Sequence, residues 1–292
     1  MKLFRYILPA ILPALSLMAC SRSVDAQTAN NSNNTMTEQT ADTTSVRVAV
    51  RTTAGNFTVL LYGDTPKHRD NFVKLVNEGY YDNTLFHRVI KDFMIQAGDP
   101  DSKTAQPGQA LGAGGPGYKI DAEIVYPRHF HKRGALAAAR QGDQVNPMKQ
   151  SSGSQFYIVT GRKSSEAEMK QMAQHLKNNQ MQAIFNRLAL AHRDAIIEMQ
   201  RKGDRAGLQA LQDTLIKQTE AEAAAAPAPE ITPEMKQAYT TVGGAPHLDG
   251  EYTVFGEVVE GMETIDRIEK AETDGRDRPS QDIRILSMKI EK

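Results

Sequence analysis

The sequence contains no tryptophan and a single cysteine, Cys20, in its 292 residues. A lone cysteine excludes an intramolecular disulfide, and it also excludes a metal site built from cysteine thiolates. A charge of one sign does not dominate either, because Lys and Arg together number 35 and Asp and Glu together number 35. This balance provides no broad electrostatic attraction to nucleic acid. We therefore expect no nucleic-acid partner.

An apolar run near the N-terminus is too short to span a bilayer. Lys2 and Arg5 precede it, and it ends in Leu17-Met18-Ala19-Cys20. This layout is typical of a secretory signal, which we predict over residues 1–19. The last four residues resemble a bacterial lipobox, in which the cysteine is lipidated and becomes the mature N-terminus.

This resemblance predicts a lipoprotein whose partner is the membrane, through a lipidated Cys20. The protein would lie in the cell envelope and face the periplasm or the cell exterior. The alternative is a soluble secreted protein in which Cys20 carries no lipid. Downstream, residues 21–44 hold only Val24 and Met36 as large apolar side chains. Such a stretch buries too little surface to offset its ordering entropy, so residues 20–45 are predicted to be a flexible tether.

Short strands and turns dominate the pattern from Val46 onward. Apolar residues alternate with others at 46–51, and a turn at residues 53–56 completes a hairpin. Helices are predicted from Pro66 to just before Gly79, with Thr65 as the N-cap, and over Met262–Glu269. Further strands are expected at Leu85–Ile90, Phe93–Ala97, Ala135–Ala139, Gln155–Thr160, Tyr252–Val259 and Ile283–Ile290. The fold class is therefore mainly β: a closed antiparallel barrel with two capping helices.

Residues 162–246 interrupt this pattern with helical periodicity. Ser165 and Glu168 form a capping box, and the apolar spacing that follows predicts one helix ending at Gly203. Asp204 caps a second helix, which the alanine-rich stretch 220–229 is expected to break. Thr232-Pro233 opens a third helix. We predict a helical insertion at 162–246 between two barrel segments, 46–161 and 247–292.

Several blocks in the barrel segments resemble the signature of the cyclophilin-type peptidyl-prolyl cis/trans isomerases. In order, they are Phe86-His87-Arg88-Val89-Ile90, Phe93-Met94-Ile95-Gln96-Ala97-Gly98-Asp99, Leu111-Gly112-Ala113-Gly114-Gly115, Gly134-Ala135-Leu136-Ala137-Ala138-Ala139, Gly153-Ser154-Gln155-Phe156-Tyr157-Ile158 and the run from Leu248 to Val258. The blocks keep the family's order, which makes a chance resemblance very improbable.

The resemblance implies an eight-stranded barrel with a peptide groove on its outer face, proline-containing polypeptides as partners, and neither cofactor nor metal. By the family's pattern the catalytic residues are Arg88, Gln96 and Phe93. The substrate-binding positions are Met94, Gly112, Ala139, Arg140, Gln155, Tyr157, His247, Leu248 and Tyr252. Three of these depart from common family residues: His247 stands where Trp is frequent, Arg140 where Asn is common, and Tyr252 where His is often found.

Proline isomerisation requires these residue types for a physical reason. Rotation of an X–Pro bond loses amide resonance against a barrier of about 20 kcal/mol, but it breaks no covalent bond. In the twisted state the proline nitrogen regains a lone pair, to which a fixed guanidinium such as that of Arg88 can donate. This interaction is scarcely available to the planar ground state, so it stabilises the transition state selectively. Phe93, Met94, Tyr157 and Leu248 would hold the proline ring, and Gln96 would bind a substrate carbonyl.

Other interpretations compete with these assignments. Arg88 in a strand is also typical of an ion-paired surface residue, and His87 reads as a hydrogen-bonded structural histidine because the reaction transfers no proton. For the whole protein, the alternative is a proline-peptide-binding chaperone or interaction module whose methionine-rich insertion contacts clients or a protein partner. The same methionines could instead pack the insertion's helices together.

Overall fold

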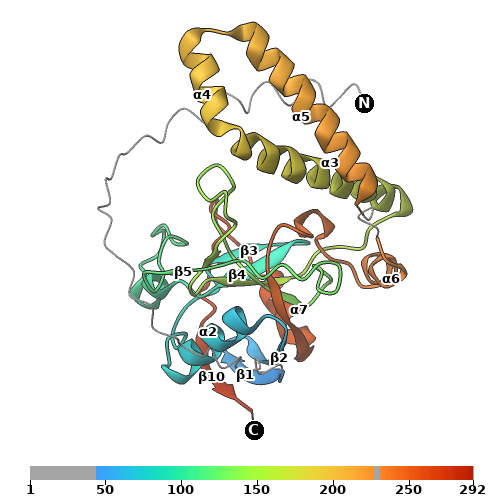
Figure 1. The fold of residues 1–292 in the computed structure, drawn as a ribbon. Helices are drawn as coiled ribbons and strands as arrows, with labels where there is room; N and C mark the ends of the chain where they lie inside the picture. The colour runs from blue at the N-terminus through green and yellow to red at the C-terminus, as the bar shows by residue number, and fades with distance from the viewer. Residues whose placement is uncertain (1–43, 227–230, 292) are drawn as a thin grey trace, which may run out of the picture. The chain divides into compact units, whose positions relative to one another are not determined.

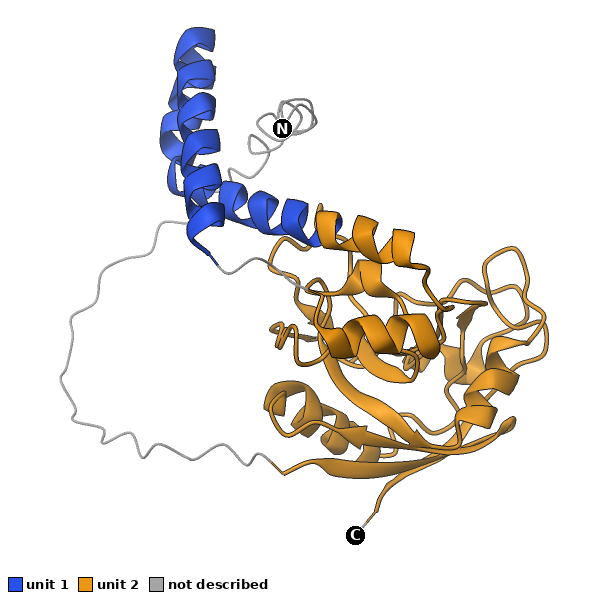
Figure 2. Cartoon of the chain, turned by 90° about the vertical axis from the view of Figure 1, so that its right-hand side faces the viewer, with its two compact units in different colours: residues 1–39, 175–229 blue, residues 40–174, 230–292 orange. Residues whose placement is uncertain are grey.

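The computed structural model describes residues 44–226 and 231–291. The described residues divide into two compact units, one within residues 40–174 and 230–292 and one within residues 175–229 (Figure 2). The predicted signal peptide and Cys20 lie outside the described residues, as does the predicted tether except for its last two residues.

The larger unit is built around an eight-stranded antiparallel sheet with the order β10-β1-β2-β9-β6-β8-β4-β3 (Figure 1). Its strands are β1 (Val46–Thr52), β2 (Gly55–Leu61), β3 (Arg88–Ile90), β4 (Met94–Ala97), β6 (Ala135–Ala138), β8 (Phe156–Val159), β9 (Val254–Glu260) and β10 (Ile285–Ile290). The sheet is an open half-barrel that curls through 221°. The mainly β, cyclophilin-like architecture is thus confirmed, but the closure of the barrel is not.

The edges of the half-barrel approach each other without pairing as strands. Ahead of the edge strands β3 and β10, Leu85 and Arg284 form an isolated antiparallel bridge. The amide of Phe86 also donates to the carbonyl of Ile283 at 2.9 Å. These contacts link the segments before β3 and β10, and the strands themselves remain the two ends of the sheet.

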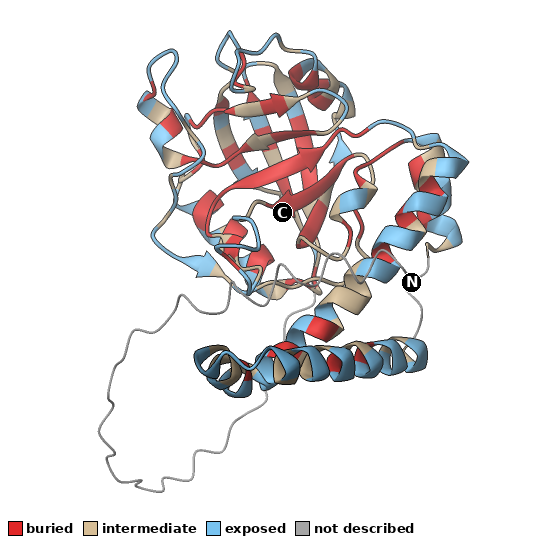
Figure 3. Ribbon diagram, turned by 90° about the horizontal axis from the view of Figure 1, so that it is seen from above, coloured by how far each residue is buried: buried red, intermediate tan, exposed pale blue. Residues whose placement is uncertain are grey.

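The main core fills the inside of the half-barrel. The alternation predicted for the first strand is confirmed, because Val48 and Val50 are buried and Arg51 is exposed. Figure 3 shows the buried strands enclosed by exposed loops. Helix α2 (Pro66–Asn77) adds Phe72, Leu75 and Val76 to this core, and α7 (Met262–Glu269) adds two isoleucines. Both capping helices lie where the sequence predicts them.

The N-terminus of α2 differs from the prediction. The Thr65 side chain does not cap the helix; its hydroxyl donates to the carbonyl of Tyr62 instead. The cap comes from Glu123, whose carboxylate accepts from the amides of Lys67 at 3.0 Å and His68 at 2.9 Å. A carboxylate binds these free amides more strongly than a hydroxyl does, and it also complements the helix dipole.

Three smaller elements complete the larger unit. Strands β5 (Lys119–Ile120) and β7 (Ser151–Ser152) form a two-stranded sheet that the sequence analysis does not predict. Two 3₁₀ turns, η3 (Pro100–Thr104) and η4 (Pro246–Leu248), lie in the loops.

Residues 162–246 contain α3 (Glu166–Ala191), α4 (Arg193–Lys202), α5 (Arg205–Ala225) and α6 (Pro233–Thr241). The capping box is confirmed, since Ser165 Oγ accepts from the amide of Glu168 and the Glu168 carboxylate accepts from the amide of Ser165. The predicted caps Asp204 and Thr232 also accept from first-turn amides of α5 and α6.

One helix boundary corrects the prediction and another refines it. The single helix expected up to Gly203 is two helices, because His192 has the non-helical backbone angles φ −102° and ψ 14°. Helix α5 ends within the alanine-rich stretch, as predicted, but it continues through the alanines to Ala225 because alanine is the strongest helix former.

The smaller unit has its own apolar contacts. Phe185 and Ala189 of α3 and Leu215 of α5 are buried together. Leu188, Leu211 and Ile216 pack around them. Among the helices of the described residues, none combines the length and the apolar composition needed to cross a lipid bilayer.

Candidate active site

Strands β3, β4 and β8 place three predicted site residues next to one another. In the antiparallel register Arg88 lies opposite Gln96, and Gln96 lies opposite Tyr157. Directly opposed residues of neighbouring strands project to the same face of a sheet. Arg88, Gln96 and Tyr157 therefore form a row across the outer face of the half-barrel.

Side chains of this region are apolar on both faces of the sheet. Along β8, Phe156 and Ile158 belong to the main core, whereas Tyr157 and Val159 belong to a second apolar cluster. Met94 of β4 joins this second cluster. Because side chains alternate along a strand, the same short strands build the core and an apolar surface outside it.

This outer surface borders a cavity of about 380 Å³. Most of the predicted site residues line it: Arg88, Phe93, Met94, Gln96, Gly112, Ala139, Arg140, Tyr157, Leu248 and Tyr252. Gln155 and His247 do not line this cavity, but each contacts a residue that does. The structure thus brings together residues that are up to 164 positions apart, Arg88 and Tyr252.

The Arg88 side chain faces this cavity and is about half exposed, at 43%. Its Nη1 lies 3.5 Å from Gln96 Oε1, and its Nε lies 3.6 Å from Asp277 Oδ2. Asp277 is itself 46% exposed, so this ion pair is solvated and weak. The guanidinium is therefore held at the cavity without being buried in a salt bridge.

A chain of amides fixes the orientation of Gln96. Its Nε2 donates to Gln155 Oε1 at 3.0 Å. Gln155 Nε2 in turn donates to the carbonyls of Gly112 at 3.0 Å and Gly114 at 2.8 Å. Since these donors assign the amide orientations, the Oε1 of Gln96 is directed toward Arg88.

The apolar wall is formed by Phe93, Met94, Tyr157 and Leu248. Met94 and Tyr157 are 2% and 5% exposed, and burial raises the pKa of Tyr157 well above its usual value. His247 does not line the cavity, but its ring packs on Phe93 with centroids 5.3 Å apart and so contacts the wall. The wall can hold a compact apolar ring beside a cation.

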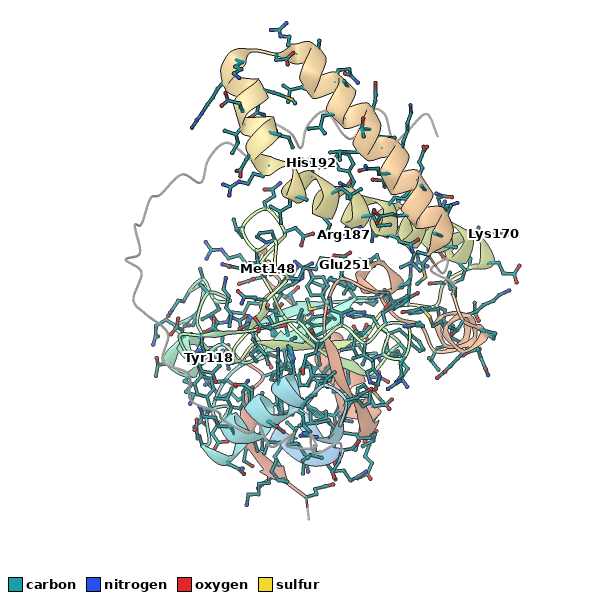
Figure 4. The ribbon with its side chains drawn as sticks, in the orientation of Figure 1. Tyr118, Met148, Lys170, Arg187, His192 and Glu251 are labelled. Carbon is teal, nitrogen blue, oxygen red and sulfur yellow. The ribbon has the colours of Figure 1, made fainter. Side chains whose placement is uncertain are left out.

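Arg140 forms one rim of the cavity. Its guanidinium lies 4.4 Å above the ring of Tyr252, and its Nε donates to the carbonyl of Glu251 at 2.9 Å. Glu251, labelled in Figure 4, also pairs with Lys149 at 2.7 Å. Beside Lys149 in this rim loop, the labelled Met148 is exposed. Arg140 therefore anchors the loop while its aromatic partner faces the cavity.

His87 differs from the sequence interpretation. It is 5% exposed and lines the cavity, but neither ring nitrogen has a hydrogen-bond partner among the described residues. The expectation of a hydrogen-bonded structural histidine is wrong. Burial lowers its pKa to about 4, so the ring is neutral at physiological pH.

Sequence reasoning missed two loop segments of the cavity. They contribute Gln109, Ala110, Leu111, Asp274, Arg276 and Arg278. Arginines join the two loops, since Arg278 Nη1 donates to the carbonyl of Gln106 at 2.9 Å and Arg276 Nη1 to that of Gly108 at 3.3 Å. No periodicity or spacing in these loops signals this pairing, although the Leu111 block of the family signature borders it.

The described residues hold no cluster of three or more His, Cys, Asp or Glu side chains arranged to bind a metal ion. What the cavity does combine is the half-exposed guanidinium of Arg88 among further arginines, an oriented amide and an apolar wall. Such a site can bind the small apolar ring of a peptide residue and donate hydrogen bonds to the backbone of that peptide.

Comparisons with known proteins identify the family of this chain. Residues 47–220 and 223–290 match the family model described as "Cyclophilin type peptidyl-prolyl cis-trans isomerase/CLD". A Staphylococcus haemolyticus protein named "Putative peptidyl-prolyl cis-trans isomerase" is 29% identical over 247 residues, which cover 84% of this chain and 91% of that protein.

A Streptococcus pyogenes protein named "Putative bifunctional phosphatase/peptidyl-prolyl cis-trans isomerase" is 30% identical. The alignment covers 85% of this chain but only 39% of that protein. A crystal structure of a Cryptosporidium parvum cyclophilin-type isomerase has a TM-score of 0.49 and 23% identity, over 85% of this chain and 99% of that one. Because the family model matches more than half of the sequence, this chain belongs to the cyclophilin-type peptidyl-prolyl cis-trans isomerases.

Proposed function

We propose that the protein accelerates X–Pro rotation in extracytoplasmic polypeptides by donating a hydrogen bond from Arg88 to the proline nitrogen in the twisted state. The observation that carries this proposal is the place of Arg88. Its guanidinium lines the same cavity as the apolar wall, and it contacts Gln96. A proline ring against that wall would present its nitrogen to the cation.

The division of labour follows from the contacts. Phe93, Met94 and Leu248 would hold the ring, because apolar burial favours it in the planar and the twisted states alike. Gln96, oriented by Gln155, would bind a backbone carbonyl beside the rotating bond. Arg88 alone would gain strength as the nitrogen pyramidalises, and only interactions that strengthen in the transition state raise the rate.

The test is the isomerisation rate of a short Ala–Pro peptide with the purified protein. A fixed donor in an oxyanion hole contributes about 3–4 kcal/mol, and by analogy Arg88→Ala should lower kcat/KM about 100- to 1,000-fold. Arg88→Lys keeps the charge but loses the forked guanidinium, so its kcat/KM should lie between those of the wild type and Arg88→Ala. The exposed Arg51 of β1 supplies the matched control, Arg51→Ala. Equal rates for wild type and Arg88→Ala would refute the proposal.

We also propose that Cys20 carries a lipid and anchors the protein in the cell envelope. The support is the lipobox-like sequence Leu17-Met18-Ala19-Cys20 after a short apolar run. Mass spectrometry of the mature N-terminal peptide would reveal the lipid on Cys20. A Cys20→Ser variant should be released from membranes, and an unmodified cysteine in the wild type would contradict the proposal.

A second candidate is a client-binding role of the helical region. Its support is Leu190 of α3, which is 63% exposed. Against it, Met169, Met172 and Met235 are at most 6% exposed, so these methionines pack inside the protein. Removing residues 175–229 deletes one compact unit and keeps α6. If aggregation suppression by this variant equals that of the full chain, the candidate is wrong.

A further inference from the structure

A buried carboxylate lies behind the cavity. Asp249 follows η4, whose Leu248 lines the cavity, and its side chain is 0% exposed. Its Oδ1 accepts from the backbone amide of His131 at 2.8 Å and contacts His131 Nδ1 at 2.9 Å. Its Oδ2 accepts from the Tyr239 hydroxyl at 2.6 Å. Both carboxylate oxygens are therefore satisfied by protein groups.

His131 connects this carboxylate to the cavity wall. A carboxylate accepts hydrogen bonds only, so Nδ1 of His131 carries the proton toward Asp249. The opposite nitrogen, Nε2, lies 2.9 Å from the hydroxyl of Tyr157, whose ring lines the cavity. The rings of His131 and Tyr157 are nearly parallel, at 11°. The imidazole thus fixes the far end of the Tyr157 side chain.

Tyr239 enters this network from α6, which follows residues 175–229 in the chain. Its ring is fully buried and packs edge-on against Phe130 with centroids 5.5 Å apart. The carbonyl of Tyr239 also accepts from the amide of Ser164 at 2.9 Å. The larger unit contains α6 together with Asp249 and His131. A helix beyond the family's signature blocks therefore supplies a buried donor to the cavity's support.

We propose that Tyr239, Asp249 and His131 are positioning residues that hold the Tyr157 ring at the angle required by the bound proline. This inference rests on the proposed function of the same cavity. Leaving a buried polar group without a hydrogen-bond partner destabilises the fold. The side chains of Tyr239, Asp249, His131 and Tyr157 are therefore restricted to one arrangement. Removing the Tyr239 hydroxyl leaves Oδ2 of Asp249 unpaired and frees Asp249 and His131 to shift. The wall then loses its fixed orientation, and no group that touches the substrate has been removed.

The test is a double-mutant cycle of Tyr239→Phe and Tyr157→Phe in the full chain, with kcat and KM for an Ala–Pro peptide measured by NMR exchange. We expect Tyr239→Phe to raise KM about five-fold, with kcat within two-fold. In the Tyr157→Phe background the same change should alter KM less than 1.5-fold, because the hydroxyl it acts through is gone. Equal effects in both backgrounds, or none in either, would overturn the proposal.

Two further measurements separate positioning from loss of stability. Tyr81→Phe removes another buried hydroxyl, which donates to the carbonyl of Ser154 at 3.3 Å, and should leave KM unchanged. If Tyr239→Phe does not fold, NMR of the wild-type protein still tests the proposal through the hydroxyl proton of Tyr157. A slowly exchanging Tyr157 hydroxyl proton correlated with His131 Nε2 supports the chain, and a rapidly exchanging hydroxyl proton without that correlation refutes it. Wild-type activity combined with either negative result would reject the positioning role while leaving the isomerase function intact.

Discussion

The carboxylate of Glu123 lies 2.6 Å from Nδ1 of His68, a residue 55 positions earlier in the chain. The opposite nitrogen of His68 lies 2.9 Å from Ser151 Oγ. Glu123 also caps α2, so it fastens this helix to the loop before β6, while His68 links the helix to the small sheet at β7. Neither of the two side chains lines the cavity, so we expect this contact to act on stability.

Glu123→Gln should destabilise the fold at neutral pH by about 1–3 kcal/mol, since it removes a charged acceptor of buried donors. Burial by itself would raise the pKa of Glu123, but hydrogen bonds from His68 and from two backbone amides outweigh it and lower the pKa below its usual 4.5. The stabilisation is therefore complete above pH 4.5 and is lost as the pH falls through the depressed folded-state value.

Urea unfolding at pH 7 and pH 3 measures this effect. The difference between wild type and variant should shrink at pH 3. The exposed Glu272 gives the matched control, Glu272→Gln, with little change at either pH. A constant difference across the two pH values would contradict the assignment.

His87 predicts a second, separate acid sensitivity. Its folded-state pKa of about 4 lies below the usual 6.5, so between these pH values His87 is protonated in the unfolded chain but neutral in the native protein. Stability is complete above pH 6.5 and decreases as the pH falls toward 4, by about 2 kcal/mol at pH 5. His87→Gln should remove this slope between pH 7 and pH 5. Parallel pH–stability curves for the two proteins would show that His87 is not responsible.

The amide nitrogen of Gln155 should contribute to stability and activity because it donates hydrogen bonds to two backbone carbonyls. Gln155→Glu preserves the shape but places a carboxylate oxygen against the carbonyls of Gly112 and Gly114. We expect a loss of about 1–3 kcal/mol in stability and about a tenfold drop in kcat/KM, because repulsion from these carbonyls displaces the side chain that accepts from Gln96 Nε2. Gln237→Glu, at an exposed position of α6, is the control. Activity of Gln155→Glu equal to that of the wild type would disprove a role for the amide chain.

Arg140 is expected to act on binding. Arg140→Lys loses the planar contact with Tyr252 and the hydrogen bond from Nε to the carbonyl of Glu251. Lysine does not reproduce a stacked, forked contact, so KM should rise about three- to ten-fold while kcat stays within two-fold. Arg128→Lys changes a guanidinium that is 71% exposed and should have no such effect. An unchanged KM for Arg140→Lys would show that the contacts of Arg140 with Tyr252 and Glu251 do not contribute to substrate binding.

The sequence predicts the site well where local pattern and chemistry coincide. Arg88, Gln96 and Tyr157 sit in short strands whose alternation is visible, and the antiparallel register then makes them neighbours. It predicts poorly where distant loops meet. The cap from Glu123 and the contact of Arg278 with Gln106 join residues far apart, and neither partner carries a local signal for the other.

Other differences have equally physical origins. His192 is an ordinary helix residue by propensity, so only its backbone angles reveal the break after α3. Closure of the barrel depends on whether the segments before β3 and β10 continue as a ladder, and a single bridge at Leu85 is not visible in periodicity.

The double use of β4, β6 and β8 restricts how this protein can change its length. Each of these strands has only four residues, and neighbouring positions serve opposite sides of the sheet. Deleting one residue from β4 would turn Met94 inward and Ile95 outward, which would spoil the hydrophobic interior and the catalytic surface in one step. The connecting segments carry no such constraint, and one of them holds four helices between Glu166 and Thr241. Within these strands, adding or dropping a single residue would exchange the two faces.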